Sequence, residues 1–128
     1  MEFYLNILKH NGYKLTANRK FIHEVMLKNK RPLTLSEIQE LCNKIDFATI
    51  YRIVNLYCKL QIVNQVNLFD KQQYYEIMKD DHHHHVVCQS CGKIDRVDLC
   101  VSDQVSKLTN YSITNHTMEF KGLCPECK

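Results

Sequence analysis

The stretch that decides the fold is DHHHHVVCQSCGKIDRVD, residues 81–98, in which four histidines lead into the pair Cys88-x-x-Cys91. A second pair, Cys124-Pro-Glu-Cys127, lies near the end of the sequence. Two C-x-x-C pairs that are well separated in the sequence, as these are, are typical of a closed tetrahedral zinc site with four thiolate ligands. A redox C-x-x-C motif is the alternative, but it needs only one pair, at a helix N-terminus. We therefore predict a structural zinc site at these four cysteines.

The four histidines can serve two sites. In an extended segment, successive side chains point to opposite faces, so His82 and His84 share one face and His83 and His85 share the other. An affinity tag is the plainer interpretation, but tags are usually longer and terminal. Mixed nitrogen and oxygen ligands suit Zn²⁺, Fe²⁺, Mn²⁺ or Co²⁺. The candidate partners for the histidines are Glu76, Asp95, Asp98, Asp103 and His116.

Composition indicates a soluble globular protein. The 128 residues are 45% hydrophobic and 24% charged, with a net charge of +3 concentrated as basic residues in the first half. This asymmetry favours a nucleic-acid-binding half joined to a second module. We expect no signal peptide and no membrane span, and hence a cytoplasmic protein. The remaining cysteines, Cys42, Cys58 and Cys100, are predicted to be small buried hydrophobic residues.

Periodicity predicts an α+β chain in two parts, 1–78 and 79–128. The first part has helices at 2–11 and 17–29, a third helix opened by the capping box Thr34-x-x-Glu37, a fourth at 47–60, and strands at 61–67 and 73–77. Helices followed by a hairpin predict a winged helix-turn-helix whose last helix reads DNA, and the alternative is a helical core without a DNA role. The second part has strands at 86–87 and 94–97, a helix at 100–109 and a strand at 111–121.

Five motifs occur in a fixed order along almost the whole chain. They are Gly12-Tyr13-Lys14-Leu15-Thr16-x-x-Arg19, Ala48-Thr49-Ile50-Tyr51-Arg52, Tyr75-Glu76, His83-x-His85-x-x-Cys88-x-x-Cys91-Gly92-Lys93-Ile94 and Gly122-x-Cys124-x-x-Cys127. With them the chain resembles the ferric uptake regulator (Fur) family of metal-dependent transcriptional repressors. The resemblance implies a homodimer that binds a double-stranded DNA operator, with a winged-helix DNA-binding domain at 1–78 and a metal-binding dimerisation domain at 79–128. It implies no enzymatic activity, no small organic substrate and no membrane partner.

The resemblance also implies roles for individual residues. Cys88, Cys91, Cys124 and Cys127 match the structural zinc ligands. The regulatory site at the hinge, which would take Fe²⁺ or Zn²⁺ and less readily Mn²⁺, is matched by Glu76, His83 and His85. A further site in the dimerisation domain is matched by His82, His84, Asp103 and His116, and the DNA contacts by Lys14, Thr16, Arg19, Thr49, Tyr51 and Arg52.

Two positions depart from the family pattern at the hinge site. Arg31-Pro32-Leu33 stands where the family usually has a histidine, and Arg96 stands where it has an acidic residue. His23 could replace the histidine, although a lone histidine on a helix is more often unliganded. These departures predict a weak or rewired hinge site.

Several other functions compete with this interpretation. Glu76, His83 and His85 could hold a catalytic metal in a hydrolase, but the sequence has no H-E-x-x-H helix and no paired nucleophile and base. A structural zinc module is the other rival, and it leaves Tyr51 and Arg52 without a role. Within the family we favour iron sensing, with zinc sensing and peroxide sensing as the alternatives.

Overall fold

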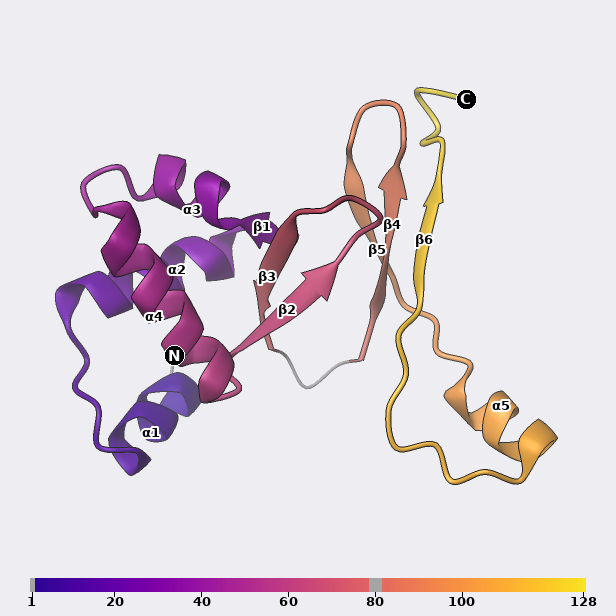
Figure 1. Cartoon of the computed structure of the whole chain (residues 1–128), viewed down its shortest axis with the longest axis horizontal. Coiled ribbons are helices and arrows are strands. Elements are labelled where there is room, and N and C mark those ends of the chain that lie inside the picture. Colours follow the sequence, from indigo (N-terminus) through magenta and orange to yellow (C-terminus); the bar gives the residue numbers. More distant parts are fainter. Residues whose placement is uncertain (1, 79–81) are drawn as a thin grey trace. The chain divides into compact units, whose positions relative to one another are not determined.

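The computed structural model describes residues 2–78 and 82–128 (Figure 1). They belong to two compact units, Met1–Met78 and Lys79–Lys128. The boundary between the predicted parts 1–78 and 79–128 adjoins residues 79–81, which lie outside the described part of the chain. None of the described helices is long and apolar enough to cross a membrane.

The first unit is a group of four helices beside a small antiparallel sheet (Figure 1). The sheet has the order β1-β3-β2, and β1 is a two-residue strand that the sequence analysis missed. The elements are α1 (Glu2–His10), α2 (Ala17–Lys28), β1 (Leu33–Thr34), α3 (Leu35–Leu41), α4 (Phe47–Lys59), β2 (Val63–Asn67) and β3 (Gln73–Ile77). The order of helices followed by a hairpin is the one predicted for a winged helix-turn-helix.

Side-chain caps fix where the helices begin. Thr16 accepts the backbone N–H of Arg19 at the start of α2, and Asp46 accepts that of Thr49 at the start of α4. At α3 the predicted capping box is present, with Thr34 and Glu37 each bonded to the other's backbone. These caps turn the amphipathic patterns of the sequence into helices with defined ends.

The core of the first unit includes a buried histidine. His23 is 2% exposed, and its ring stacks on that of Tyr4 with centroids 3.8 Å apart. The hydroxyl of Tyr4 hydrogen-bonds to that of Tyr57, and Tyr57 also donates to the carbonyl of Arg19. Burial lowers the pKa of His23 to about 4, so the ring is neutral at pH 7. His23 is therefore a core residue of this unit.

The two cysteines of the first unit differ in burial. Cys42 is fully buried in the core, as predicted, whereas Cys58 was also predicted to be buried but is only partly so, packing against the core from outside. Burial raises the pKa of both thiols, so both stay protonated at neutral pH.

The second unit is a three-stranded sheet with one helix. It comprises β4 (His84–Cys88), β5 (Ile94–Val97), α5 (Ser102–Thr109) and β6 (Glu119–Gly122). The sheet order is β5-β4-β6, with β4 antiparallel to β5 and parallel to β6. The strand predicted at 111–121 forms only over its last residues, because pairing with β4 starts at His85↔Glu119 and residues 111–118 face no described strand.

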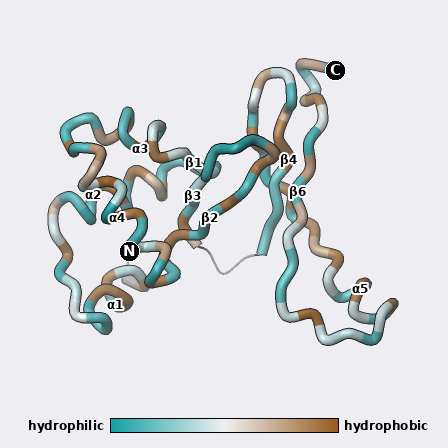
Figure 2. Tube along the Cα trace, viewed as in Figure 1, coloured by the Kyte–Doolittle hydropathy of each residue, from teal (hydrophilic) through white to brown (hydrophobic). Residues whose placement is uncertain are grey.

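This second unit buries very little apolar surface. Among its described residues only His84, His85 and Cys88 are buried, whereas the continuous hydrophobic core lies in the first unit. Helix α5 has no buried residue although Figure 2 shows hydrophobic stretches along it. A unit of this size with so small a core needs a metal or a partner chain to be stable.

Candidate metal centres and nucleic-acid interface

The four predicted zinc ligands lie together and form what we call the four-cysteine cluster. The sulfur atoms of Cys88, Cys91, Cys124 and Cys127 are all within 4.8 Å of one another. The Cys91 and Cys124 sulfurs are 3.8 Å apart. Thiolates around zinc, at Zn–S distances of about 2.3 Å, would be about 3.8 Å apart in a tetrahedron. The cluster thus has the donor type, donor number and spacing of a closed zinc site.

Two tight turns build the four-cysteine cluster. In the first, Gly92 adopts φ 78°, which favours glycine, and donates its N–H to the carbonyl of Cys88 at the end of β4. In the second, which follows β6, Cys127 donates its N–H to the carbonyl of Cys124. The backbone of Gln89 donates to Gly122 and joins the two turns.

The electrostatics of the four-cysteine cluster also suit a cation. Backbone N–H groups of Cys91 and Cys124 point at the Cys88 sulfur, both at 3.4 Å, and lower its pKa to about 6. Burial and hydrogen bonds with the neighbouring thiols raise the pKa of Cys124 to about 12. The Cys88 thiolate therefore forms readily, whereas ionisation of the Cys124 thiol is disfavoured. A bound divalent cation would stabilise both thiolates and so remove this barrier to ionisation.

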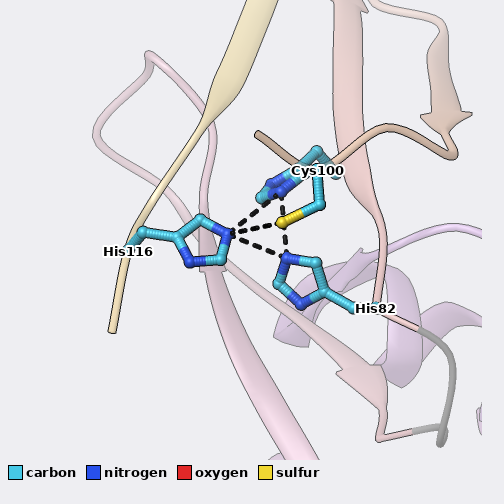
Figure 3. A group of neighbouring side chains, drawn as sticks. His82, Cys100 and His116 are labelled. Carbon is cyan, nitrogen blue, oxygen red and sulfur yellow. Dashed lines mark hydrogen bonds between the residues drawn. The ribbon is translucent and has the colours of Figure 1, made fainter. Parts of the chain in front are cut away.

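The histidine run alternates between two faces, as the sequence predicted. The ring centroids of His82 and His84 are 4.6 Å apart, and those of His83 and His85 are 4.9 Å apart. His82 and His84 meet His116, which lies in the loop before β6, and Cys100, which lies just before α5 (Figure 3). We call these four residues the histidine–cysteine cluster. Asp103, predicted here, is not in the group: it is exposed in the first turn of α5.

His85 has a carboxylate neighbour that the sequence analysis missed. Glu119 on β6 accepts the backbone N–H of His85 at 3.0 Å and lies 3.3 Å from its Nδ1. This contact occupies Nδ1, so a metal at His85 would be bound by Nε2. On its other side, His85 is in register with Arg96 on β5, and Arg96 donates to Asp98. Neither Asp95 nor Asp98 belongs to a metal-ligand group among the described residues.

The predicted hinge site draws ligands from both units. Glu76 is on β3 of the first unit, opposite Asn64 on β2, and is half-buried. His83 and His85 belong to the second unit. Because each unit is described by itself, a hinge site that spans both units remains a prediction. Arg31, next to Pro32 in the stretch that stands where the family usually has a histidine, forms an ion pair with Glu37. Burial opposes ionisation of Glu37, but hydrogen bonds from Arg31 and Thr34 outweigh it and lower the pKa.

Helix α4 has one buried face and one exposed face. Ile50, Val54 and Tyr57 point into the core, whereas Tyr51 is 51% exposed and Arg52 is exposed. A chain of hydrogen bonds runs along the exposed face. The Thr49 hydroxyl donates to Asp46 at 2.6 Å and accepts from the Arg52 guanidinium at 3.3 Å. This exposed face has the polar and aromatic groups that a recognition helix presents to bases and phosphates.

The loop before α2 is held in a fixed shape. Gly12 ends α1 with φ 78°, and the Arg19 guanidinium donates to the carbonyl of Lys14 at 2.7 Å while lying 5.5 Å from the ring centroid of Tyr13. Thr16 caps α2. Of the three residues predicted here for DNA contact, Thr16 and Arg19 thus also have structural roles, and the Lys14 side chain is exposed.

Comparison with known proteins identifies the family to which the chain belongs. The model of the ferric uptake regulator family matches residues 10–121. A ferric uptake regulation protein of Staphylococcus epidermidis is 32% identical over 129 residues, covering 97% of this chain and 93% of that protein. The chain therefore belongs to the ferric uptake regulator family, a family of metal-responsive regulators.

Solved structures agree with the sequence relatives. The Helicobacter pylori ferric uptake regulator, described as having three functional metal-binding sites, superposes with a TM-score of 0.81 at 25% identity, covering 98% of this chain and 89% of that one. The Vibrio cholerae ferric uptake regulator superposes with a TM-score of 0.78 at 26% identity, covering 94% of this chain and 99% of that one. The α+β fold class predicted from the sequence is confirmed.

Proposed function

We propose that this chain is a metal-responsive transcriptional repressor that binds operator DNA as a homodimer in the cytoplasm, with iron as the sensed metal. The observation that carries the proposal is the division of α4 into a buried apolar face and an exposed face bearing Thr49, Tyr51 and Arg52. A helix held this way by its core face can enter the major groove without rearranging the unit.

DNA contacts would come from two segments of the first unit. On α4, Tyr51 and Arg52 would contact bases and phosphates, with Thr49 holding the Arg52 guanidinium. In the loop before α2, Lys14 would reach the phosphate backbone. Arg19 would act there mainly by fixing the loop, because its guanidinium donates to the Lys14 carbonyl, and Thr16 mainly by capping α2, because its hydroxyl accepts the backbone N–H of Arg19. Fixing these groups before binding lowers the entropy that association costs.

The metal sites would divide the work between stability and regulation. The four-cysteine cluster would hold Zn²⁺ permanently. Glu76, His83 and His85 would bind the regulatory metal and so couple the two units. Metal and operator would then strengthen each other's binding by the same coupling energy, typically about 1–3 kcal/mol. Pro32 and Arg96, which stand where the family usually has ligands, favour the lower end of that range.

A second copy of the chain would cover the apolar surface of the second unit. Helix α5 has no buried residue. Several large hydrophobic side chains of this unit are exposed, up to 85% for Leu108. The set comprises Leu99, Val105, Leu108, Tyr111, Phe120 and Leu123. Exposed apolar area of this kind marks an interaction surface, and a twofold dimer would bring two α4 helices to successive half-sites.

Zinc sensing is the second candidate function. It is favoured by the Cys100 sulfur, which lies 3.5 Å from Nε2 of His116 in the histidine–cysteine cluster. Thiolates select zinc over iron and manganese more strongly than carboxylates do. A regulator whose second site prefers zinc could respond to zinc supply as well as to iron.

Selection from a random duplex DNA library tests the proposal. Wild-type protein loaded with Fe²⁺ or Zn²⁺ should enrich one palindromic sequence, with affinity that falls steeply as salt rises. Arg52→Ala should weaken binding by about 10-fold or more, since a good base contact is worth about 1–3 kcal/mol. Lys28→Ala, which removes an exposed lysine at the end of α2, is the matched control and should bind as wild type. The proposal would be contradicted if neither the Fe²⁺-loaded nor the Zn²⁺-loaded protein enriched a sequence.

A further inference from the structure

The three histidines of the histidine–cysteine cluster converge through the same ring atom. Nε2 of His82 lies 3.0 Å from Nε2 of His84 and 2.9 Å from Nε2 of His116. The remaining pair, His84 and His116, is separated by 3.3 Å between the same atoms. The three nitrogens thus form a small triangle.

Hydrogen bonds alone cannot satisfy this triangle. Each Nε2 of a neutral imidazole either carries a proton and donates, or carries a lone pair and accepts. With three nitrogens and two roles, at least one of the three pairs must be two donors or two acceptors. A cation that accepts a lone pair from all three nitrogens removes the conflict. The triangle is therefore the arrangement of a metal ligand set.

Cys100 supplies the fourth corner. Its sulfur lies 3.5 Å from Nε2 of His116, and all four donor atoms are within 4.8 Å of one another (Figure 3). In a tetrahedral zinc site with these ligands, nitrogen atoms would be about 3.3 Å apart, and a nitrogen and a sulfur about 3.6 Å apart. The three nitrogen–nitrogen separations of 2.9–3.3 Å and the separation of 3.5 Å between the Cys100 sulfur and Nε2 of His116 lie within a few tenths of an ångström of these values.

Neighbouring groups orient two of the four ligands. The His84 ring is buried and hydrogen-bonds to the backbone of Met118, a contact that leaves Nε2 for the cluster. The Ser102 hydroxyl lies 3.2 Å from the Cys100 sulfur, where it can donate to a thiolate. Because α5 begins at Ser102, Cys100 precedes the helix and is not turned outward with its exposed residues. These contacts hold the donors in place before any metal arrives.

We propose that Cys100 completes a three-histidine, one-thiolate metal site with His82, His84 and His116, and that its thiolate makes the site selective for Zn²⁺ over Fe²⁺ and Mn²⁺. The thiolate takes the place that the family resemblance gives to the carboxylate of Asp103. Four protein ligands at tetrahedral spacing suit Zn²⁺, while Mn²⁺ prefers oxygen ligands in an octahedron. The proposal concerns the ligand set and holds whether or not the chain binds DNA.

Cobalt provides a direct test because Co²⁺ bound to a thiolate has a near-ultraviolet sulfur-to-metal charge-transfer band. Full-length protein with one retained Zn²⁺ in the four-cysteine cluster is stripped of labile metal and titrated with Co²⁺ under reducing conditions. We expect wild type to gain this band together with tetrahedral d–d bands. Zn²⁺ at one equivalent should abolish both sets of bands, and a tenfold excess of Mn²⁺ should not.

Two variants locate the ligand. Cys100→Ser should lose the charge-transfer band, whereas Asp103→Asn, the matched control three residues away, should keep it. Retained zinc per chain shows that the four-cysteine cluster is intact in each sample and contributes no cobalt signal. A saturated wild-type cobalt spectrum without the band would overturn the proposal, and so would loss of the band in Asp103→Asn alone.

A measurement on wild type alone guards against a variant that does not fold. With the four-cysteine cluster loaded with zinc, one further equivalent of Zn²⁺ should slow alkylation of Cys100 by iodoacetamide at least tenfold, as read by peptide mass mapping. Cys58 provides the internal reference, because it lies outside both cysteine-containing groups. Equal alkylation of Cys100 with and without the added zinc would show that the metal is held elsewhere.

Discussion

Zinc bound by the four-cysteine cluster should hold the second unit folded, and removing it should unfold that unit alone. The buried residues of the described part of this unit are His84, His85 and Cys88, so apolar burial contributes little to its stability. The first unit has its own core, built on residues such as Ile22, Ile50 and Val54. The two units should therefore respond differently to chelation.

The size of the effect follows from the ligand set. Structural zinc sites contribute about 10–16 kcal/mol of binding free energy at neutral pH. Shared among four thiolates, this is roughly 2.5–4 kcal/mol for each ligand, so replacing one should weaken zinc binding about 10²–10³-fold. Cys127→Ser is the informative change. Cys58→Ser also removes one thiol but lies outside the cluster, and it should retain zinc as wild type does.

Hydrogen exchange read by mass spectrometry separates the two units. After chelation, or in Cys127→Ser, amides of β4, β5 and β6 should lose protection while those of α2 and α4 keep it. Zinc content is measured on the same samples. Protection of β4–β6 that survives complete removal of zinc would refute the reasoning, and so would simultaneous loss of protection in both units.

Three further predictions concern the first unit. In the folded chain the pKa of His23 is lowered from 6.5 to about 4. Between these two pH values the histidine is therefore protonated in the unfolded chain and neutral in the folded chain. The free energy of unfolding is therefore unaffected by His23 above pH 6.5 and falls by up to about 3 kcal/mol as the pH drops towards 4. Urea unfolding at pH 7 and pH 5 measures this loss, and His23→Phe should show a smaller difference between the two pH values than wild type does. Thr34→Ala removes the capping box of α3 and should cost about 1 kcal/mol in the same assay, while Thr34→Ser should cost less. Gly12→Ala forces alanine to φ 78° and should cost about 1 kcal/mol, although nothing lies within 4 Å of the added methyl group.

Patterns within single segments predicted most of the fold. The helical periodicity of apolar residues and the capping box at Thr34 indicated the helices to within a few residues. Strand β1 was missed because two residues carry no periodicity, and it exists only through pairing with Tyr74 and Tyr75 on β3. The strand predicted at 111–121 was too long because strand length depends on the partner, and β4 begins at His84.

The candidate metal-binding residues likewise fall into those that local sequence patterns predict and those that depend on the three-dimensional fold. C-x-x-C spacing and the alternation of His82–His85 are local signals, and both groupings appear in the structure. Cys100 was assigned to the core because nothing local sets it apart from Cys42 and Cys58. Its place beside His116 depends on where α5 begins. Glu119 meets His85 only through the register of β6 on β4, which a single sequence does not reveal.

The most direct test of the account is operator affinity measured as a function of regulatory metal, with the four-cysteine cluster kept full of zinc. The duplex selected by the wild-type protein serves as the probe, and Fe²⁺ is titrated anaerobically, with Zn²⁺ in a parallel series. We expect at least one of the two metals to tighten binding by about 5-fold or somewhat more, near the lower end of a coupling energy of about 1–3 kcal/mol, and His83→Ala to abolish the increase. Affinity that stays constant from metal-free to metal-saturated protein would contradict the claim that this chain is a metal-responsive regulator.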